Sequence, residues 1–135
     1  AYRNFLNVGK TERECVTQII REARAAGYES LEEKTAKGEK LKAGDKVYTV
    51  GMKKIIALFH IGQDDISEGM NILGAHIDSP RLDVKQNPLY EDTDLAYLDT
   101  HYYGGVKKYQ WVTLPLAIHG VVEKKRRKYS RSKYR

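Results

Sequence analysis

The sequence predicts an α/β fold, and three patterns in its first 75 residues indicate it. Residues 12–26 repeat apolar side chains at helical spacing. Residues 47–50 and 55–61 are rich in β-branched and aromatic side chains and flank a turn signal, which predicts a β-hairpin. Residues 70–75 form a largely apolar run, as is typical of an inner strand covered on both faces. Together the patterns predict a mixed α/β domain.

The predicted helix has clear start and stop signals. Thr11 and Glu14 have the spacing of a capping box, and Gly27 is a natural stop just past the last turn. The single cysteine, Cys15, precedes an apolar stripe made of Val16, Ile19, Ile20 and Ala23. We therefore expect Cys15 to be a buried packing residue rather than a nucleophile.

A short helical turn is expected to start at Ser30–Glu33, and a charged loop follows it. Lysines alternate with glutamates in this region, which favours a solvated face over an anion-binding site; these lysines are Lys34, Lys37, Lys40 and Lys42.

Composition is that of a soluble globular protein with one modest domain. The chain has 135 residues, of which 41% are hydrophobic and 31% are charged. No apolar run approaches the length of a membrane span, and Ala1–Lys10 lacks the apolar core of a signal peptide. Because the lone Cys15 also suits a reducing compartment, a cytoplasmic location is expected.

The positive net charge of +6 comes from the C-terminal tail alone. Residues 123–135 contain eight of the 24 basic residues and one of the 18 acidic residues. Residues 1–122 therefore keep 16 basic and 17 acidic residues and are close to neutral. Nucleic-acid binding could only be argued for residues 124–135.

The pair His76 and Asp78 stands at the end of the third predicted strand, just before Pro80. Residues i and i+2 of a strand point to the same face, and proline ends the ladder. A neutral imidazole can bind a metal through one nitrogen while a carboxylate holds the proton on the other. By itself the pair is only a weak signal of a metal site, and a hydrogen-bonded surface pair is the more common interpretation of this spacing.

The other polar candidates carry weaker signals. His60, His101 and His119 lie at positions typical of core, loop or half-exposed strand histidines, and Asp83 is typical of a solvated loop carboxylate. Residues 86–105 lack a clean period and predict a loop-rich connection, and residues 109–113 and 116–122 predict the last strands. The acidic cluster in that connection lacks the EF-hand spacing of a calcium site; its members are Glu91, Asp92, Asp94 and Asp99.

Whole phrases of the sequence closely resemble the zinc aminopeptidases of the aspartyl aminopeptidase type, in their bacterial form. The phrases are GAHIDSPRLDVKQNPLYEDTDLAYLDTHYYGG, from Gly74 to Gly105, and KKYQWVTLPLAIHGVV, from Lys107 to Val122. The resemblance implies an N-terminal part of a zinc-peptidase α/β sheet domain in residues 1–88. It also implies the start of an inserted β-rich domain, with roles in substrate binding and oligomerisation, in residues 89–122.

The resemblance implies that His76 is a zinc ligand and that Asp78 is the catalytic-site carboxylate behind it, followed by a cis peptide bond. The implied activity is removal of acidic or neutral N-terminal residues from peptides by two zinc ions that share a water. The remaining metal ligands and the general-base glutamate of that family lie beyond position 135. The resemblance thus implies an N-terminal fragment that is inactive alone, binds zinc weakly and associates through unpaired sheet edges into a homo-oligomer.

Two alternatives stay open. In the first, the chain is not an aminopeptidase fragment but a non-catalytic module that pairs with related subunits. In the second, it is a nucleic-acid binder that acts through residues 124–135. The tail itself is either a native cationic arm or the product of a shifted reading frame. Codons exist for Lys128–Tyr134 that, read one base later, encode an alternating strand-like segment.

Overall fold

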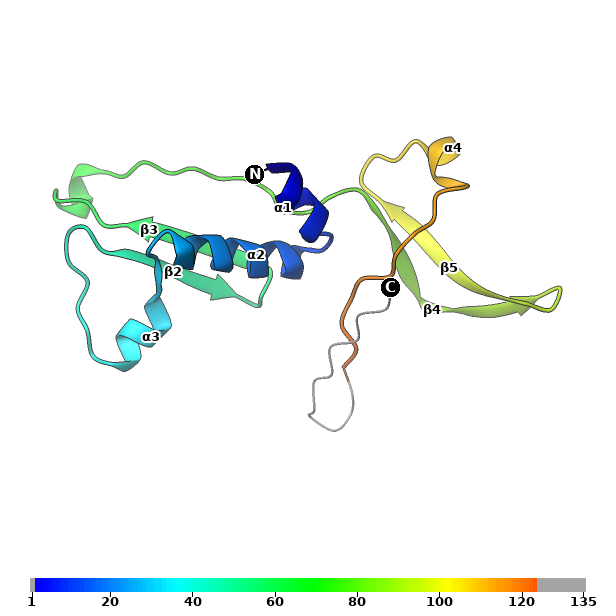
Figure 1. The fold of residues 1–135 in the computed structure, drawn as a ribbon, viewed down its shortest axis with the longest axis horizontal. Coiled ribbons are helices and arrows are strands. Elements are labelled where there is room, and N and C mark those ends of the chain that lie inside the picture. The colour runs from blue at the N-terminus through cyan, green and yellow to red at the C-terminus, as the bar shows by residue number, and fades with distance from the viewer. Residues whose placement is uncertain (1, 124–135) are drawn as a thin grey trace. The chain divides into compact units, whose positions relative to one another are not determined.

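The computed structural model describes residues 2–123, and the chain divides into two compact units, residues 1–77 and residues 78–135. The first unit contains α1 (Tyr2–Val8), α2 (Glu12–Ala25), β1 (Glu29–Ser30), α3 (Leu31–Ala36), β2 (Lys46–Gly51), β3 (Ile55–His60) and a 3₁₀ turn, η1 (Ile66–Glu68) (Figure 1). The second contains β4 (Arg81–Asp92), β5 (Leu95–Tyr103) and α4 (Lys108–Trp111).

Helix α2 forms as the sequence predicts. The Thr11 hydroxyl accepts a hydrogen bond from the Glu14 amide at 3.3 Å, and the Glu14 carboxylate accepts one from the Thr11 amide at 3.1 Å. At the other end Gly27 has φ +85°, and the amide of Tyr28 returns to the carbonyl of Ala23 at 2.9 Å. Both ends therefore satisfy backbone groups that a helix leaves unpaired.

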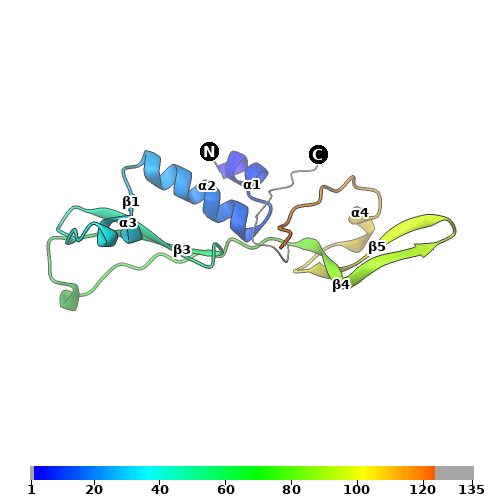
Figure 2. The same ribbon diagram turned by 90° about the horizontal axis from the view of Figure 1, so that it is seen from below.

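The predicted hairpin of residues 47–61 is confirmed as β2 and β3. Strand β2 pairs parallel to β1 and antiparallel to β3, in the order β1-β2-β3, with Lys46 opposite His60 and Gly51 opposite Ile55. Figures 1 and 2 both show α2 running alongside β2 and β3. The core of this unit is formed by Cys15, Val16, Ala23, Val47 and Tyr48.

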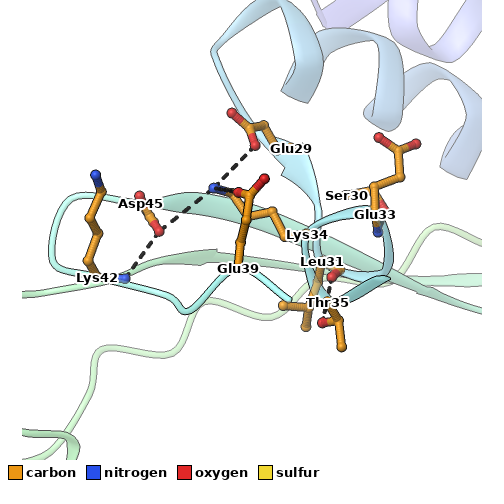
Figure 3. Close-up of polar contacts among 9 residues, drawn as sticks. All are labelled: Glu29, Ser30, Leu31, Glu33, Lys34, Thr35, Glu39, Lys42 and Asp45. Carbon is orange, nitrogen blue, oxygen red and sulfur yellow. Dashed lines mark hydrogen bonds and ion pairs between the residues drawn. The ribbon is translucent and has the colours of Figure 1, made fainter. Parts of the chain in front are cut away.

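Lys34 lies within a cluster of carboxylates rather than on a solvated face (Figure 3). Its Nζ is 3.3 Å from Glu29, 3.2 Å from Glu39 and 3.9 Å from Asp45, and its side chain is only 14% exposed. These partners raise the pKa of Lys34, Glu39 most and then Glu29. Since three carboxylates surround it, Lys34 is not an anion-binding residue; it ties β1 and α3 to the loop that enters β2.

The predicted strand of residues 70–75 is wrong. Residues 69–80 adopt no regular secondary structure, and Ile72 and Leu73 are 81% and 100% exposed. An inner strand needs neighbouring strands, and within residues 2–123 none pairs with this segment. Within the described residues, the apolar side chains of this segment therefore do not belong to a β-sheet.

The loop-rich connection predicted for residues 86–105 is also wrong, because most of it belongs to a long antiparallel hairpin, β4 and β5. Val84 pairs with Thr100 and Leu89 with Leu98, so a bulge places four residues of β4 opposite Asp99 alone. The bulge interrupts the period-2 pattern, which hides the strand from sequence reasoning, and it accommodates Pro88. Thr93 and Asp94 form the two-residue turn of the hairpin, with φ +50° and +60°, and Asp92 is the last residue of β4.

The strands predicted at residues 109–113 and 116–122 do not form. Residues 108–111 make the single-turn helix α4, and residues 114–123 have no regular structure. Pro115 has no amide hydrogen for a ladder, and within the described chain no strand pairs with residues 116–122. The expectations for the tail concern residues 124–135, which lie outside the described part of the chain.

We predict that Thr11→Ala lowers the free energy of unfolding by about 1 kcal/mol, because it removes the N-cap acceptor of α2. Denaturation by urea, followed by far-UV circular dichroism, measures the change. Thr17→Ala is the matched control on the same helix, since Thr17 is exposed and its hydroxyl donates to the carbonyl of Arg13 at 2.8 Å. A loss as large in the control as in Thr11→Ala would contradict the capping role.

Candidate metal-binding segment

His76 lies in the extended segment that ends the first unit, and its side chain is exposed. Asp78 opens the second unit and is half-buried. Because the segment is not a strand, the rule that places residues i and i+2 on one face of a sheet does not apply to this pair. Side-chain contacts hold the segment. One contact lies within the first unit and another within the second.

Within the first unit, Cys15 holds the backbone immediately after His76. Its Sγ lies 3.5 Å from the carbonyl oxygen of Ile77, and the side chain is 3% exposed. A Cβ added at Gly9, in the turn between α1 and α2, would lie 2.6 Å from this sulfur. The Cys15 thiol is thus enclosed between the α1–α2 turn and Ile77, and its burial is confirmed.

The Cys15 thiol is a donor rather than a nucleophile. Burial raises its pKa above the ordinary value, and the nearby carboxylates of Glu14 and Glu12 raise it further. The protonated form, which persists at neutral pH, is the form that can donate its hydrogen to the Ile77 carbonyl.

Within the second unit, the side chain of Tyr103 contacts Asp78. The Tyr103 hydroxyl donates a hydrogen bond to Oδ2 of Asp78 at 2.8 Å. The Arg81 guanidinium lies over the Tyr103 ring, with Cζ 4.3 Å from the ring centroid, and its Nε is 2.7 Å from Oδ1 of Asp83. Asp83 is therefore a paired strand residue and not the solvated loop carboxylate that the sequence indicated.

Tyr103 is a residue that sequence reasoning missed as part of this segment. Its contact with Asp78 joins positions 25 apart, and β5, which carries it, was predicted to be loop.

The cis peptide bond expected after Asp78 is also corrected, since no peptide bond among the described residues is cis.

The three other histidines lie outside the segment that carries His76. His60 ends β3 opposite Lys46, His101 lies on β5 opposite Asp83, and His119 lies in the irregular stretch after α4. Among residues 2–123, no group of three or more histidine, cysteine, aspartate or glutamate side chains could hold a metal ion. A catalytic zinc ion takes about three protein ligands. His76 and Asp78 have the donor chemistry of part of a zinc site, but the described residues do not complete one.

Comparison with known proteins identifies the family. The sequence model of the family described as Aminopeptidase I zinc metalloprotease (M18) matches residues 5–134. The chain belongs to this M18 family. The family that the sequence phrases indicated is thereby confirmed.

Two relatives, both described as probable M18 family aminopeptidase 1, illustrate the similarity. The protein of Clostridium acetobutylicum is 64% identical over 124 residues, which cover 92% of this chain and 27% of the relative. The protein of Thermotoga maritima is 46% identical over 127 residues, which cover 91% of this chain and 26% of the relative. The chain thus spans about a quarter of the length of the curated relatives it matches.

Solved structures agree with the mixed α/β fold. The Thermotoga maritima M18 aminopeptidase superposes with a TM-score of 0.81 at 44% identity, over 92% of this chain and 26% of the other. Aminopeptidase I from Clostridium acetobutylicum gives a TM-score of 0.76 at 64% identity, over 92% of this chain and 27% of the other. Within the described residues, no helix has the length and apolar character needed to cross a membrane.

The raised pKa of Cys15 predicts a loss of stability at alkaline pH. The cysteine thiol of an unfolded chain has a pKa of about 8.5, and in the folded chain the Cys15 thiol keeps its proton to higher pH. The free energy of unfolding therefore stays constant with respect to this group below about pH 8.5. It falls as pH rises above that value, by at most about 1.4 kcal/mol per unit.

Urea denaturation between pH 7 and 9.5 measures this slope, with Cys15→Ser as the control that lacks the titrating thiol. We expect a steeper alkaline fall in the wild type than in the variant. Equal slopes would mean that the thiol titrates alike in the folded and unfolded chains.

Proposed function

We propose that this chain supplies one zinc ligand, His76, and its orienting carboxylate, Asp78, to an M18-type aminopeptidase. The proposed reaction is removal of acidic or neutral N-terminal residues from peptides. The observation that carries the proposal is the family match over residues 5–134, which includes the segment His76-Ile77-Asp78. Zinc, when bound, supplies a polarised water and stabilises charge on the peptide carbonyl oxygen.

The chain's own residues would have distinct roles at this site. A neutral His76 imidazole would bind the metal through one ring nitrogen, and the Asp78 carboxylate would accept the hydrogen bond from the other, which sets tautomer and orientation. The Ile77 carbonyl between them is held by Cys15. Because residues 2–123 do not complete a metal site, we propose that the chain alone binds zinc weakly and has no aminopeptidase activity.

The proposal keeps residues 1–88 as peptidase-domain sequence and residues 89–122 as the start of an inserted β-rich domain. The β4–β5 hairpin supports the β-rich character of the second part, and it begins at Arg81. A cytoplasmic location also stays part of the proposal.

We predict that His76→Ala abolishes activity in a chimera. The matching segment of the Clostridium acetobutylicum relative, 64% identical over 124 residues, is replaced by the segment of this chain. The chimera should release N-terminal aspartate or neutral residues from peptides, and His76→Ala should lower kcat/KM by about 100-fold or more, because a metal ligand is lost.

His60→Ala is the matched control, because His60 is an exposed histidine at the end of β3 and should leave kcat/KM unchanged. The chain by itself should show no turnover in the same assay. A chimera that is equally active with and without His76 would remove the basis of the proposal.

An open sheet edge supports a second proposal, that copies of this chain associate. Within the described residues β3 is an outer strand of the order β1-β2-β3, and Phe59 and Ile55 on it are 45% and 61% exposed. An exposed apolar edge strand is a template for pairing with another chain. This favours homo-oligomerisation, or the role of a pairing module, over nucleic-acid binding, which would depend on residues 124–135.

We predict that Phe59→Lys shifts the chain toward monomer in sedimentation-velocity measurements, since a lysine on an edge strand opposes edge-to-edge pairing. Met52→Lys adds the same charge at the β2–β3 turn, where Met52 is 80% exposed, and should not change the distribution. A monomeric wild type, or equal shifts in the two variants, would count against association through β3.

A further inference from the structure

Tyr103 is the last residue of β5, and its side chain is directed to the segment that leads into β4. In the hairpin register Tyr103 is opposite Arg81, the first residue of β4. Asp78 precedes Arg81 by three residues, so it lies beyond the last pair of the ladder. The 2.8 Å hydrogen bond from the Tyr103 hydroxyl to Oδ2 of Asp78 therefore continues the association of the two chain segments past the end of the sheet.

The ring that carries this hydroxyl is itself held in place. Arg81, directly across the ladder, covers the ring with its guanidinium at 4.3 Å from the centroid, and Asp83 fixes that guanidinium through Nε at 2.7 Å. A cation over a tyrosine face and a cross-strand pair both stabilise one side-chain arrangement. The hydroxyl is thus presented to Asp78 from a ring with restricted freedom.

The backbone after Tyr103 closes on the same segment. Gly104 has φ +75°, and a Cβ at this position would lie 3.3 Å from Cα and 3.4 Å from Cγ of Pro80. The turn after β5 therefore approaches Pro80 closely, at a backbone conformation that glycine adopts without strain. Residues 78–80 are contacted twice from this end of β5, once by a side chain and once by backbone.

We propose that Tyr103 is a positioning residue, which fixes the carboxylate of Asp78 and with it the segment that follows His76. A carboxylate accepts hydrogen bonds at both oxygens, so a bond at Oδ2 sets the plane of the group and the direction of its other oxygen. That direction decides whether the carboxylate can orient an imidazole. Only this last consequence rests on the proposed metal role of His76; the hold of Tyr103 on Asp78 does not.

The first measurement uses the whole 135-residue chain, labelled with ¹⁵N and free of metal. Backbone order parameters of Ile77, Asp78 and Ser79 should fall from the rigid range near 0.85 toward 0.6 or below in Tyr103→Phe, which keeps the ring and removes the hydroxyl. Tyr102→Phe is the matched control, since this neighbouring tyrosine ring lies against Lys108 and its loss of a hydroxyl should change nothing. Cross-strand contacts of β4 and β5 report that each variant is folded.

The second measurement is the zinc dissociation constant of the same chain, from shifts of the His76 and Asp78 resonances during titration with zinc. Tyr103→Phe should weaken zinc binding by about 10-fold, as expected for loss of a group that orients a ligand, and Tyr102→Phe should not. The double variant Asp78→Ala with Tyr103→Phe should be no weaker than Asp78→Ala alone, because the tyrosine acts through Asp78.

The outcomes separate the two proposals. Unchanged order parameters in Tyr103→Phe overturn the hold of Tyr103 on Asp78. Reduced order with an unchanged zinc dissociation constant, or additive effects in the double variant, overturns its positioning role and leaves a structural contact. If His76→Ala leaves zinc binding intact, the proposed metal ligand is wrong, and the order parameters alone still decide whether Tyr103 holds Asp78.

Discussion

A β-strand requires a neighbour, and this constraint governs how the segment around His76 is built. Residues 69–80 have the apolar character of an inner strand, yet within residues 2–123 no strand pairs with them. Unpaired backbone groups in an extended segment must be satisfied by water or by side chains. The Cys15 thiol at the Ile77 carbonyl is a contact of this second kind, and the Tyr103 hydroxyl holds the segment through the side-chain carboxylate of Asp78.

The two contacts depend on the two most regular parts of the chain. Cys15 is placed by α2, whose capping box fixes the first turn in which the cysteine lies and whose core neighbours include Val16 and Ala23. Tyr103 is placed by the register of β4 and β5, which sets it opposite Arg81. A change in the helix start or in the hairpin register would therefore reach the His76–Asp78 segment without touching either residue.

The exposed apolar surface agrees with the short span of the chain relative to its family. Relatives such as the Clostridium acetobutylicum protein are more than three times as long, and the match covers 27% of that protein. In a longer protein, a strand like β3 and an apolar run such as Ile72-Leu73 can pair with further strands. Apolar runs of this kind are typical of strands in the interior of a sheet. Among the described residues, no group of three or more potential metal ligands accompanies the candidate ligand His76.

Local signals in the sequence determined α2, the β2–β3 hairpin and the family. A capping box, a helical apolar period and a turn flanked by β-branched residues act over a few positions, and the phrase around His76 and Asp78 is specific enough to indicate the M18 aminopeptidases. The helix and the hairpin can be recognised before any tertiary contact is known, because each has local signals among its own neighbours in sequence. The family is recognised from the identity of the residues in the phrase.

Tertiary structure alone decided the rest. The β4–β5 hairpin was hidden because its bulge between Val84 and Leu89 breaks the period of two on which strand prediction depends. The strand expected at residues 70–75 failed because pairing is a property of two segments and not of one. The contacts of Cys15 with Ile77 and of Tyr103 with Asp78 span 62 and 25 positions, so only packing in three dimensions brings them to the segment that carries the candidate ligand.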